Sequence, residues 1–214
     1  MPHDDFQFEP VPGLPTHLPQ GEEILWQGRP AVFGFARDVL KLRWVAGYFL
    51  FLMVWRGIAN SDQGLAAVLQ NTLPLILFAA AAVAAILGLA AIMALTTMYT
   101  ITTRRVVIRK GAALSFSLNL PFSKIISADL AKRPDGSGTI VLKMSDPIGL
   151  GYIMVWPHVR PWRMKVVEPS LRSIKDAGRV SDILAEAAVT SIREGSGAQL
   201  QPEGVPDGPV LAAE

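Results

Sequence analysis

Residues 73–95 read LPLILFAAAAVAAILGLAAIMAL, a stretch with no charged and no strongly polar side chain. About 20 such residues in a helix, at about 1.5 Å per residue, cross the roughly 30 Å hydrocarbon core of a membrane. A helix that is apolar on every side is either a membrane span or the centre of a large core. A chain of 214 residues is too short to surround it. The stretch therefore predicts a transmembrane helix.

A second, shorter apolar segment covers residues 44–60 and contains Arg56 near its end. From that position the arginine can extend its charged group to the membrane interface, so this segment also predicts a transmembrane helix. The polar stretch 61–72 connects the two segments. Two apolar helices joined by a short loop predict a hairpin.

The second helix carries signals at its start and along one side. Asn71 or Thr72 is expected to cap it, with Pro74 in its first turn. Small residues recur at helical spacing and allow another helix to approach closely. This small-residue stripe consists of Ala80, Ala84, Gly88 and Ala91. We expect it to pack on the first helix of the hairpin, and the alternative is a partner protein.

Basic residues lie before and after the hairpin, whereas its loop has none after Arg56, which predicts that both termini are cytoplasmic. Residues 1–20 are acidic and proline-rich, do not resemble a signal peptide, and are expected to be disordered. Residues 21–43 are expected to form an ordered segment before the membrane. Within it, residues 31–43 predict either a helix in the headgroup layer or the beginning of the first membrane helix.

Beyond residue 95 the apolar pattern changes from a helical period to a period of two, which predicts strands. The expected strands cover residues 97–103, 105–110, 114–120, 125–130, 139–144 and 152–156. An irregular stretch follows at 157–175, and Asp176 starts a helix with one apolar stripe that should end near Gly195. The pattern predicts a small antiparallel barrel at 97–194, capped by this helix, and a disordered tail at 195–214.

The composition excludes several kinds of chemistry. The chain has no cysteine, so disulfides and thiolate sites are excluded, and its net charge of +2 does not indicate a nucleic-acid partner. Two of the three histidines fall in the expected disordered start, and no glycine-rich phosphate loop is present. We therefore expect no enzymatic activity, no metal site and no cofactor.

Two groups of residues are candidates for binding. The run WPHVRPWR predicts a protein contact because tryptophan and arginine are favoured at interfaces. Its candidate contact residues are Trp156, His158, Arg160, Trp162 and Arg163. The alternative is that the tryptophan rings fill the barrel. The second group is expected at the membrane surface because it follows the hairpin closely. It consists of Arg104, Arg105, Arg109 and Lys110.

Residues 99–111, YTITTRRVVIRKG, resemble the opening hairpin of bacterial pleckstrin-homology-like domains. Residues 21–30, GEEILWQGRP, resemble the segment that precedes the membrane hairpin in those proteins. The resemblance implies a membrane α + β fold. In that fold a two-helix transmembrane hairpin is followed by a pleckstrin-homology-like antiparallel β barrel with a C-terminal helix.

The run 156–163, together with Glu168-Pro169 and the helix from Asp176, is similar to the PuhB family of photosynthetic complex assembly proteins of purple bacteria. This resemblance implies a non-enzymatic assembly factor, or chaperone, in the bacterial inner (intracytoplasmic) membrane. Its expected partners are reaction-centre or light-harvesting subunits. A second copy of the chain, forming a homo-oligomer, is the other partner considered. The alternative is a generic membrane-anchored lipid- or protein-binding module with a pleckstrin-homology-like domain.

Overall fold

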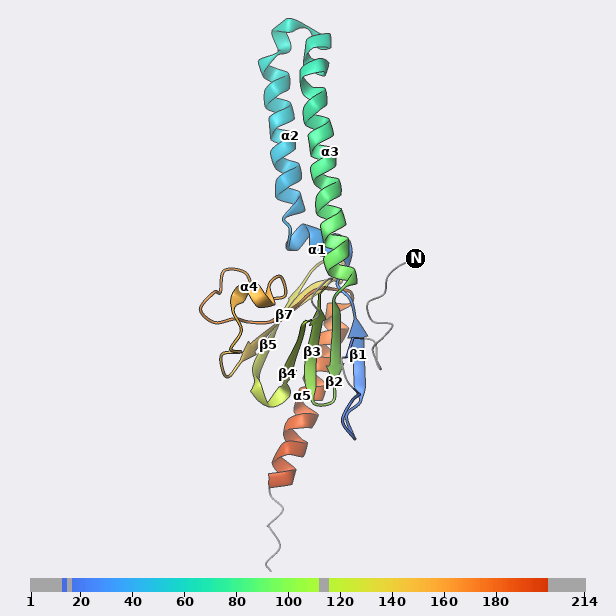
Figure 1. Cartoon of the computed structure of the whole chain (residues 1–214), viewed down its shortest axis with the longest axis vertical. Coiled ribbons are helices and arrows are strands. Elements are labelled where there is room, and N and C mark those ends of the chain that lie inside the picture. Colours follow the sequence, from blue (N-terminus) through green and yellow to red (C-terminus); the bar gives the residue numbers. More distant parts are fainter. Residues whose placement is uncertain (1–12, 15–16, 112–115, 200–214) are drawn as a thin grey trace, which may run out of the picture.

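The computed structural model describes residues 13–14, 17–111 and 116–199. A long helical hairpin stands on a small β domain, and the last helix leaves the domain at the opposite end (Figure 1). The expected disorder at residues 1–20 and 195–214 falls largely outside the described residues.

The hairpin consists of α2 (Leu42–Ala59) and α3 (Leu65–Leu95), joined through the 3-10 turn η1 (Ser61–Gln63). Both helices are long and apolar enough to cross a membrane, as their sequences predict. At 1.5 Å per residue, the 31 residues of α3 extend about 46 Å, which exceeds a hydrocarbon core of about 30 Å.

Helix α3 begins earlier than expected, because the apolar residues after Gly64 continue its helical pattern upstream. Pro74 therefore lies inside the helix, and the expected cap at Asn71 or Thr72 is wrong. The Thr72 hydroxyl instead donates to the Val68 carbonyl at 2.7 Å, as a side chain inside a helix does.

A short helix, α1 (Val32–Asp38), joins the hairpin to the β domain. Phe35 is fully buried there, in a cluster with Leu42 and with Ala90 of α3. The chain then turns at Lys41, whose φ of 57° separates α1 from α2. Residues 32–38 thus form a separate packed helix. The alternative in which the whole stretch 31–43 begins the first membrane helix is therefore wrong, although Leu42 and Arg43 do begin α2.

The β domain contains two antiparallel sheets, with strand orders β1-β2-β3-β4 and β5-β6-β7. The first sheet comprises β1 (Ile24–Gly28), β2 (Met98–Thr102), β3 (Arg105–Lys110) and β4 (Phe116–Pro121). The second comprises β5 (Ile125–Lys132), β6 (Gly138–Met144) and β7 (Ser170–Ile174), and the 3-10 turn η2 (Phe122–Lys124) joins the sheets. Among the described strands the sheets stay separate, so the expected closed barrel is not formed.

Strand β1 precedes the hairpin in sequence and pairs with β2, which follows it. The hairpin is therefore inserted between two neighbouring strands of one sheet. The ordered segment expected before the membrane supplies an edge strand to the domain that was expected to begin at residue 97.

Two predictions for the later part of the domain are wrong. The strand expected at 152–156 is a short helix, α4 (Tyr152–Val155), because Gly151 and Pro157 bracket a single turn. The stretch expected to be irregular contains β7, whose serines and arginine conceal the apolar alternation.

Helix α5 (Ala177–Gln199) packs its apolar stripe into the space between the two sheets. Val180 and Leu184 are buried there beside Ile101 of β2 and Ile140 of β6. The prediction of a covering C-terminal helix is therefore confirmed. The helix continues through Gly195, since a single glycine weakens a helix by only about 1 kcal/mol.

Candidate functional site

The connection between β6 and β7, residues 145–169, projects from the β domain and carries α4; we call it the α4 loop (Figure 1). Half of its large apolar side chains are exposed to solvent, with Ile153 87% and Trp162 88% exposed. The other exposed members are Met154, Trp156, Met164 and Val166. Exposed apolar residues gathered in one segment are typical of an interaction surface.

Acidic and basic side chains hold the base of this loop. The Glu168 carboxylate is 3% exposed and accepts hydrogen bonds from Arg160 at 3.2 Å and Arg163 at 3.1 Å. Arg160 also donates its backbone N–H to the Glu168 carbonyl at 2.9 Å. The two arginines expected to contact a partner thus also fix the shape of the loop.

His158, the third polar residue predicted to bind a partner, is 1% exposed and lies in the core. Its Nδ1 is 2.7 Å from the Tyr99 hydroxyl and its Nε2 is 3.2 Å from Thr97 Oγ1. The prediction that His158 is a contact residue is wrong, because the chain turns it inward just after α4, in the middle of the loop. The tryptophans behave oppositely: Trp162 is almost fully exposed, so its ring does not fill the domain.

These hydrogen bonds form a directed chain from β7 to the end of α3. The Arg172 backbone N–H donates to the Tyr99 hydroxyl, so that hydroxyl donates its own proton to His158 Nδ1. His158 Nε2–H then donates to Thr97, whose hydroxyl donates to the Met93 carbonyl at 2.7 Å. This assignment fixes the neutral tautomer with the proton on Nε2.

Burial, together with the nearby charges of Lys110 and Arg172, lowers the pKa of His158 to about 3. Burial likewise raises the pKa of the Tyr99 hydroxyl. Both groups are therefore neutral at physiological pH. The chain of hydrogen bonds couples the hairpin to the domain without a buried charge.

The structure does not bring together the four basic residues expected at the membrane surface. Arg104 and Arg105 lie at the β2–β3 turn, at the other end of β2 from its junction with α3. Arg105 forms an ion pair with Glu22 at 2.8 Å. The opposite end of β3 carries Arg109, which faces Met98, and Lys110, which donates to the carbonyls of Met154 and Trp156.

The small-residue stripe does not face α2. Ala80, Ala84 and Gly88 are exposed, and a Cβ added at Gly88 would meet nothing within 4 Å. Helix α3 instead directs Ala90 toward α1, with Val83 and Ile86 on the same packed side. The expectation that the stripe packs within the hairpin is wrong, because three of its four residues are exposed and the packed side of α3 faces α1.

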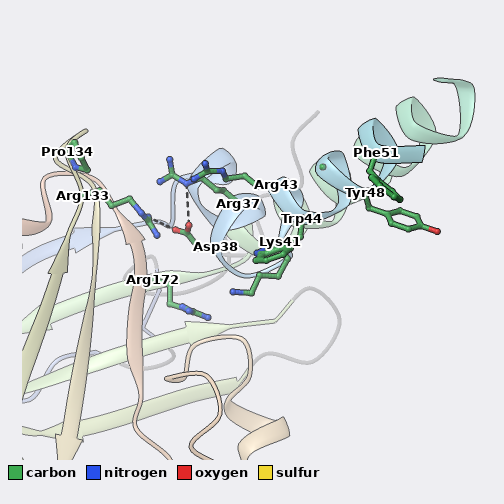
Figure 2. A pocket seen from close by; sticks show the side chains of 11 residues that line it. Arg37, Asp38, Lys41, Arg43, Trp44, Tyr48, Phe51, Arg133, Pro134 and Arg172 are labelled. Carbon is green, nitrogen blue, oxygen red and sulfur yellow. Dashed lines mark hydrogen bonds and ion pairs between the residues drawn. The ribbon is translucent and has the colours of Figure 1, made fainter. Parts of the chain in front are cut away.

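A basic cleft lies where the hairpin meets the domain (Figure 2). Its cationic side chains come from α1, the start of α2, the β5–β6 turn and β7. They are Arg37, Lys41, Arg43, Arg133 and Arg172. The sequence marks the first three as residues flanking the hairpin. The other two come from distant strands, so only the fold reveals the cluster.

A known protein family matches both the hairpin and the β domain. A family model described as bacterial PH domain matches residues 43–188, which include both hairpin helices and strands β2 to β7. The chain belongs to the bacterial PH domain family. The expectation of a pleckstrin-homology-like domain with antiparallel sheets is confirmed for this family member.

A relative of this PH-domain protein occurs in Rhodobacter capsulatus. It is described as an uncharacterized 23.7 kDa protein in the puhA 5′ region. The two are 42% identical over 197 residues, which cover 91% of this chain and 92% of the relative. A solved structure is also similar, a DUF1696 family protein with a pleckstrin-homology domain from Shewanella loihica PV-4. The match has a TM-score of 0.29 and 12% sequence identity, and it covers 43% of this chain and 71% of the Shewanella chain.

Proposed function

We propose that this protein is a non-enzymatic membrane factor that assists assembly of the photosynthetic reaction centre and its light-harvesting complex. The observation that carries the proposal is the relative in the puhA 5′ region, a photosynthesis gene neighbourhood, which matches over nearly its whole length. Shared length at this identity supports a shared role.

The hairpin supports a membrane location. Its apolar side chains are turned outward over most of the length of α2 and α3, and the described chain provides nothing that covers them. In water so much exposed apolar surface would be unfavourable, at about 25 cal/mol for each Å². A bilayer removes that cost, so the hairpin acts as the anchor of the domain.

The α4 loop is the proposed contact for an incoming subunit. Trp162 and Ile153 offer large apolar groups, while the Glu168 ion pairs keep the loop in shape. An anchored domain meets other membrane proteins at a raised effective concentration, so modest contacts suffice.

Basic residues at the base of the hairpin support a cytoplasmic domain. The chain has no cysteine, so one substitution creates one labelling site. Asp62→Cys in η1 should react with a membrane-impermeant maleimide in intact spheroplasts. Arg104→Cys in the β2–β3 turn should react only after lysis. The reverse pattern would contradict this orientation, and labelling of both in intact spheroplasts would contradict the hairpin.

The assembly role is tested by deleting the gene in its own bacterium and measuring mature complexes by absorption. We expect the amount of mature complex to fall while its absorption spectrum stays unchanged. An amount equal to that in the parent strain would contradict the proposal. Complementation with Ile153→Asp or Trp162→Asp should restore less complex than Ile126→Asp, a matched change at an exposed isoleucine on β5. A tagged protein should also recover reaction-centre or antenna subunits in mild detergent.

A further inference from the structure

We propose that the basic cleft at the base of the hairpin binds the headgroup of an anionic phospholipid. The cleft has a volume of about 1160 Å³ and is open to one side. That exceeds the range of about 300–1,000 Å³ that is usual for enclosed small-ligand sites. The inference rests on the proposed membrane location of the hairpin.

The charges that line the cleft are strongly unbalanced. Asp38 is the one carboxylate in its lining, and it forms ion pairs with Arg37 at 3.3 Å and with Arg133. Within residues 17–111 and 116–199, no ion pair joins Lys41, Arg43 or Arg172 to a carboxylate. Three cations therefore remain for a bound anion.

Arg172 supplies the inner wall of the cleft from β7 (Figure 2). Its Nη1 donates to the Pro157 carbonyl at 3.3 Å, and its Nε is buried without a hydrogen-bond partner in the described chain. A buried donor without an acceptor is unfavourable, so a ligand that supplies an acceptor is favoured there. A phosphate oxygen is an acceptor that suits a guanidinium well.

Lys41 and Arg43 supply the outer wall from the beginning of α2. Lys41 has the left-handed φ of 57°, a conformation that is uncommon for residues with a side chain and often marks a functional position. No side chain caps the N-terminus of α2, whose dipole adds to the attraction for an anion.

The cleft continues from these cations onto the apolar hairpin. Trp44, Tyr48 and Phe51 follow one another at positions i, i+4 and i+7, so they share one side of α2, and all three line the cleft. Figure 2 shows Trp44 beside Lys41, and Tyr48 and Phe51 further along the helix. A free phosphate would gain nothing from this aromatic wall, whereas a lipid places its phosphate below and its acyl chains along the wall.

The experiment measures lipid retention by the full chain in detergent, using native mass spectrometry with added phosphatidylglycerol. We expect saturable binding of one lipid that phosphatidylcholine does not reproduce. The double variant Lys41→Gln/Arg43→Gln should weaken binding by roughly tenfold or more, since each cation near an anionic lipid contributes about 1 kcal/mol. The charge-conserving pair Lys41→Arg/Arg43→Lys should keep it, which separates charge loss from misfolding.

The matched control is Arg104→Gln/Lys124→Gln, which removes the same charge from exposed sites outside the cleft lining. Equal loss in control and cleft variants, or equal binding of both lipids, would overturn the proposal. Displacement of the lipid by equimolar inorganic phosphate would overturn it too, by showing a site for free phosphate. Maleimide labelling tests the membrane location and complex amounts test the assembly role, so failure of either is distinguishable from failure here.

Discussion

The hairpin and the β domain use the same kinds of apolar residue in opposite ways. In the domain, Ile101, Ile140 and Leu171 are fully buried between the sheets and α5. In the hairpin, Leu50, Phe51 and Leu77 point outward along α2 and α3. In the proposed membrane location, lipid surrounds the hairpin and water the domain, so the segment between them must be compatible with both.

The connections between the hairpin and the β domain, at the junction of the two regions, are short. Thr96 and Thr97 alone separate α3 from β2, and the connection to α2 passes through α1. Thr97 is buried and joined to His158, while Phe35 of α1 packs against the same histidine ring with centroids 5.7 Å apart. The two regions therefore contact each other directly and are not joined by a flexible linker.

The largest effect is expected from removing the centre of this junction. His158→Ala leaves the Tyr99 hydroxyl without its acceptor and creates a cavity beside Phe35. We expect the free energy of unfolding to fall by about 2–4 kcal/mol. Chemical denaturation of the full chain in detergent measures it. Trp162→Ala, at an exposed position of the same loop, should change the free energy of unfolding by less than about 0.5 kcal/mol. Equal losses in the two variants would contradict the stabilising role of His158 in the junction.

The next effect distinguishes the two sides of α3. Ala90→Leu adds volume to the fully buried contact with Phe35 and Ala36, so it should lower the free energy of unfolding by about 1–3 kcal/mol. Ala84→Leu makes the same change in the exposed stripe and should have almost no effect in detergent. The reverse order would show that the stripe is the packed side.

The sequence predicted the apolar helices and most strands well, because length and periodicity are local signals. The second membrane helix was predicted from the absence of charge over residues 73–95, and the alternation in β4 is visible in Leu118 and Leu120 on either side of Asn119. Strand β7 escaped prediction because its pairing with β6, not its own pattern, makes it a strand. The pairing of β1 across the inserted hairpin is equally non-local.

The candidate site was less predictable for the same reason. The run from Trp156 to Arg163 was correctly singled out as unusual, but composition does not separate the buried His158 from the exposed Trp162. Arg104 and Arg105 follow the hairpin closely in sequence. Yet a strand rises about 3.3 Å per residue, so the five residues of β2 place them well away from α3. Arg133 and Arg172 reach the basic cleft only through the fold.

Stability measured as a function of pH tests whether His158 in the junction is neutral in the folded chain. The pKa of His158 is about 3 in the folded chain and about 6.5 when unfolded, so only the unfolded chain takes up this proton between those values. Its contribution is complete above pH 6.5 and is lost as the pH falls toward 3. We expect about 2 kcal/mol less stability at pH 5 than at pH 7 from this group. His158→Gln should lack that component; an unchanged pH profile would contradict the assignment.

The smallest effect on global stability is expected at the base of the α4 loop, where the change should be mainly local. Glu168→Gln removes the carboxylate that Arg160 and Arg163 share, but both arginines are partly exposed and remain hydrated. We expect a loss of about 1 kcal/mol or less. Protease cleavage within residues 156–166 should nevertheless become faster, because the loop loses its fixed base. Glu186→Gln makes the same change at an exposed position of α5, away from the α4 loop, and serves as the control. Cleavage rates that match in both variants would show that the loop keeps its shape without Glu168.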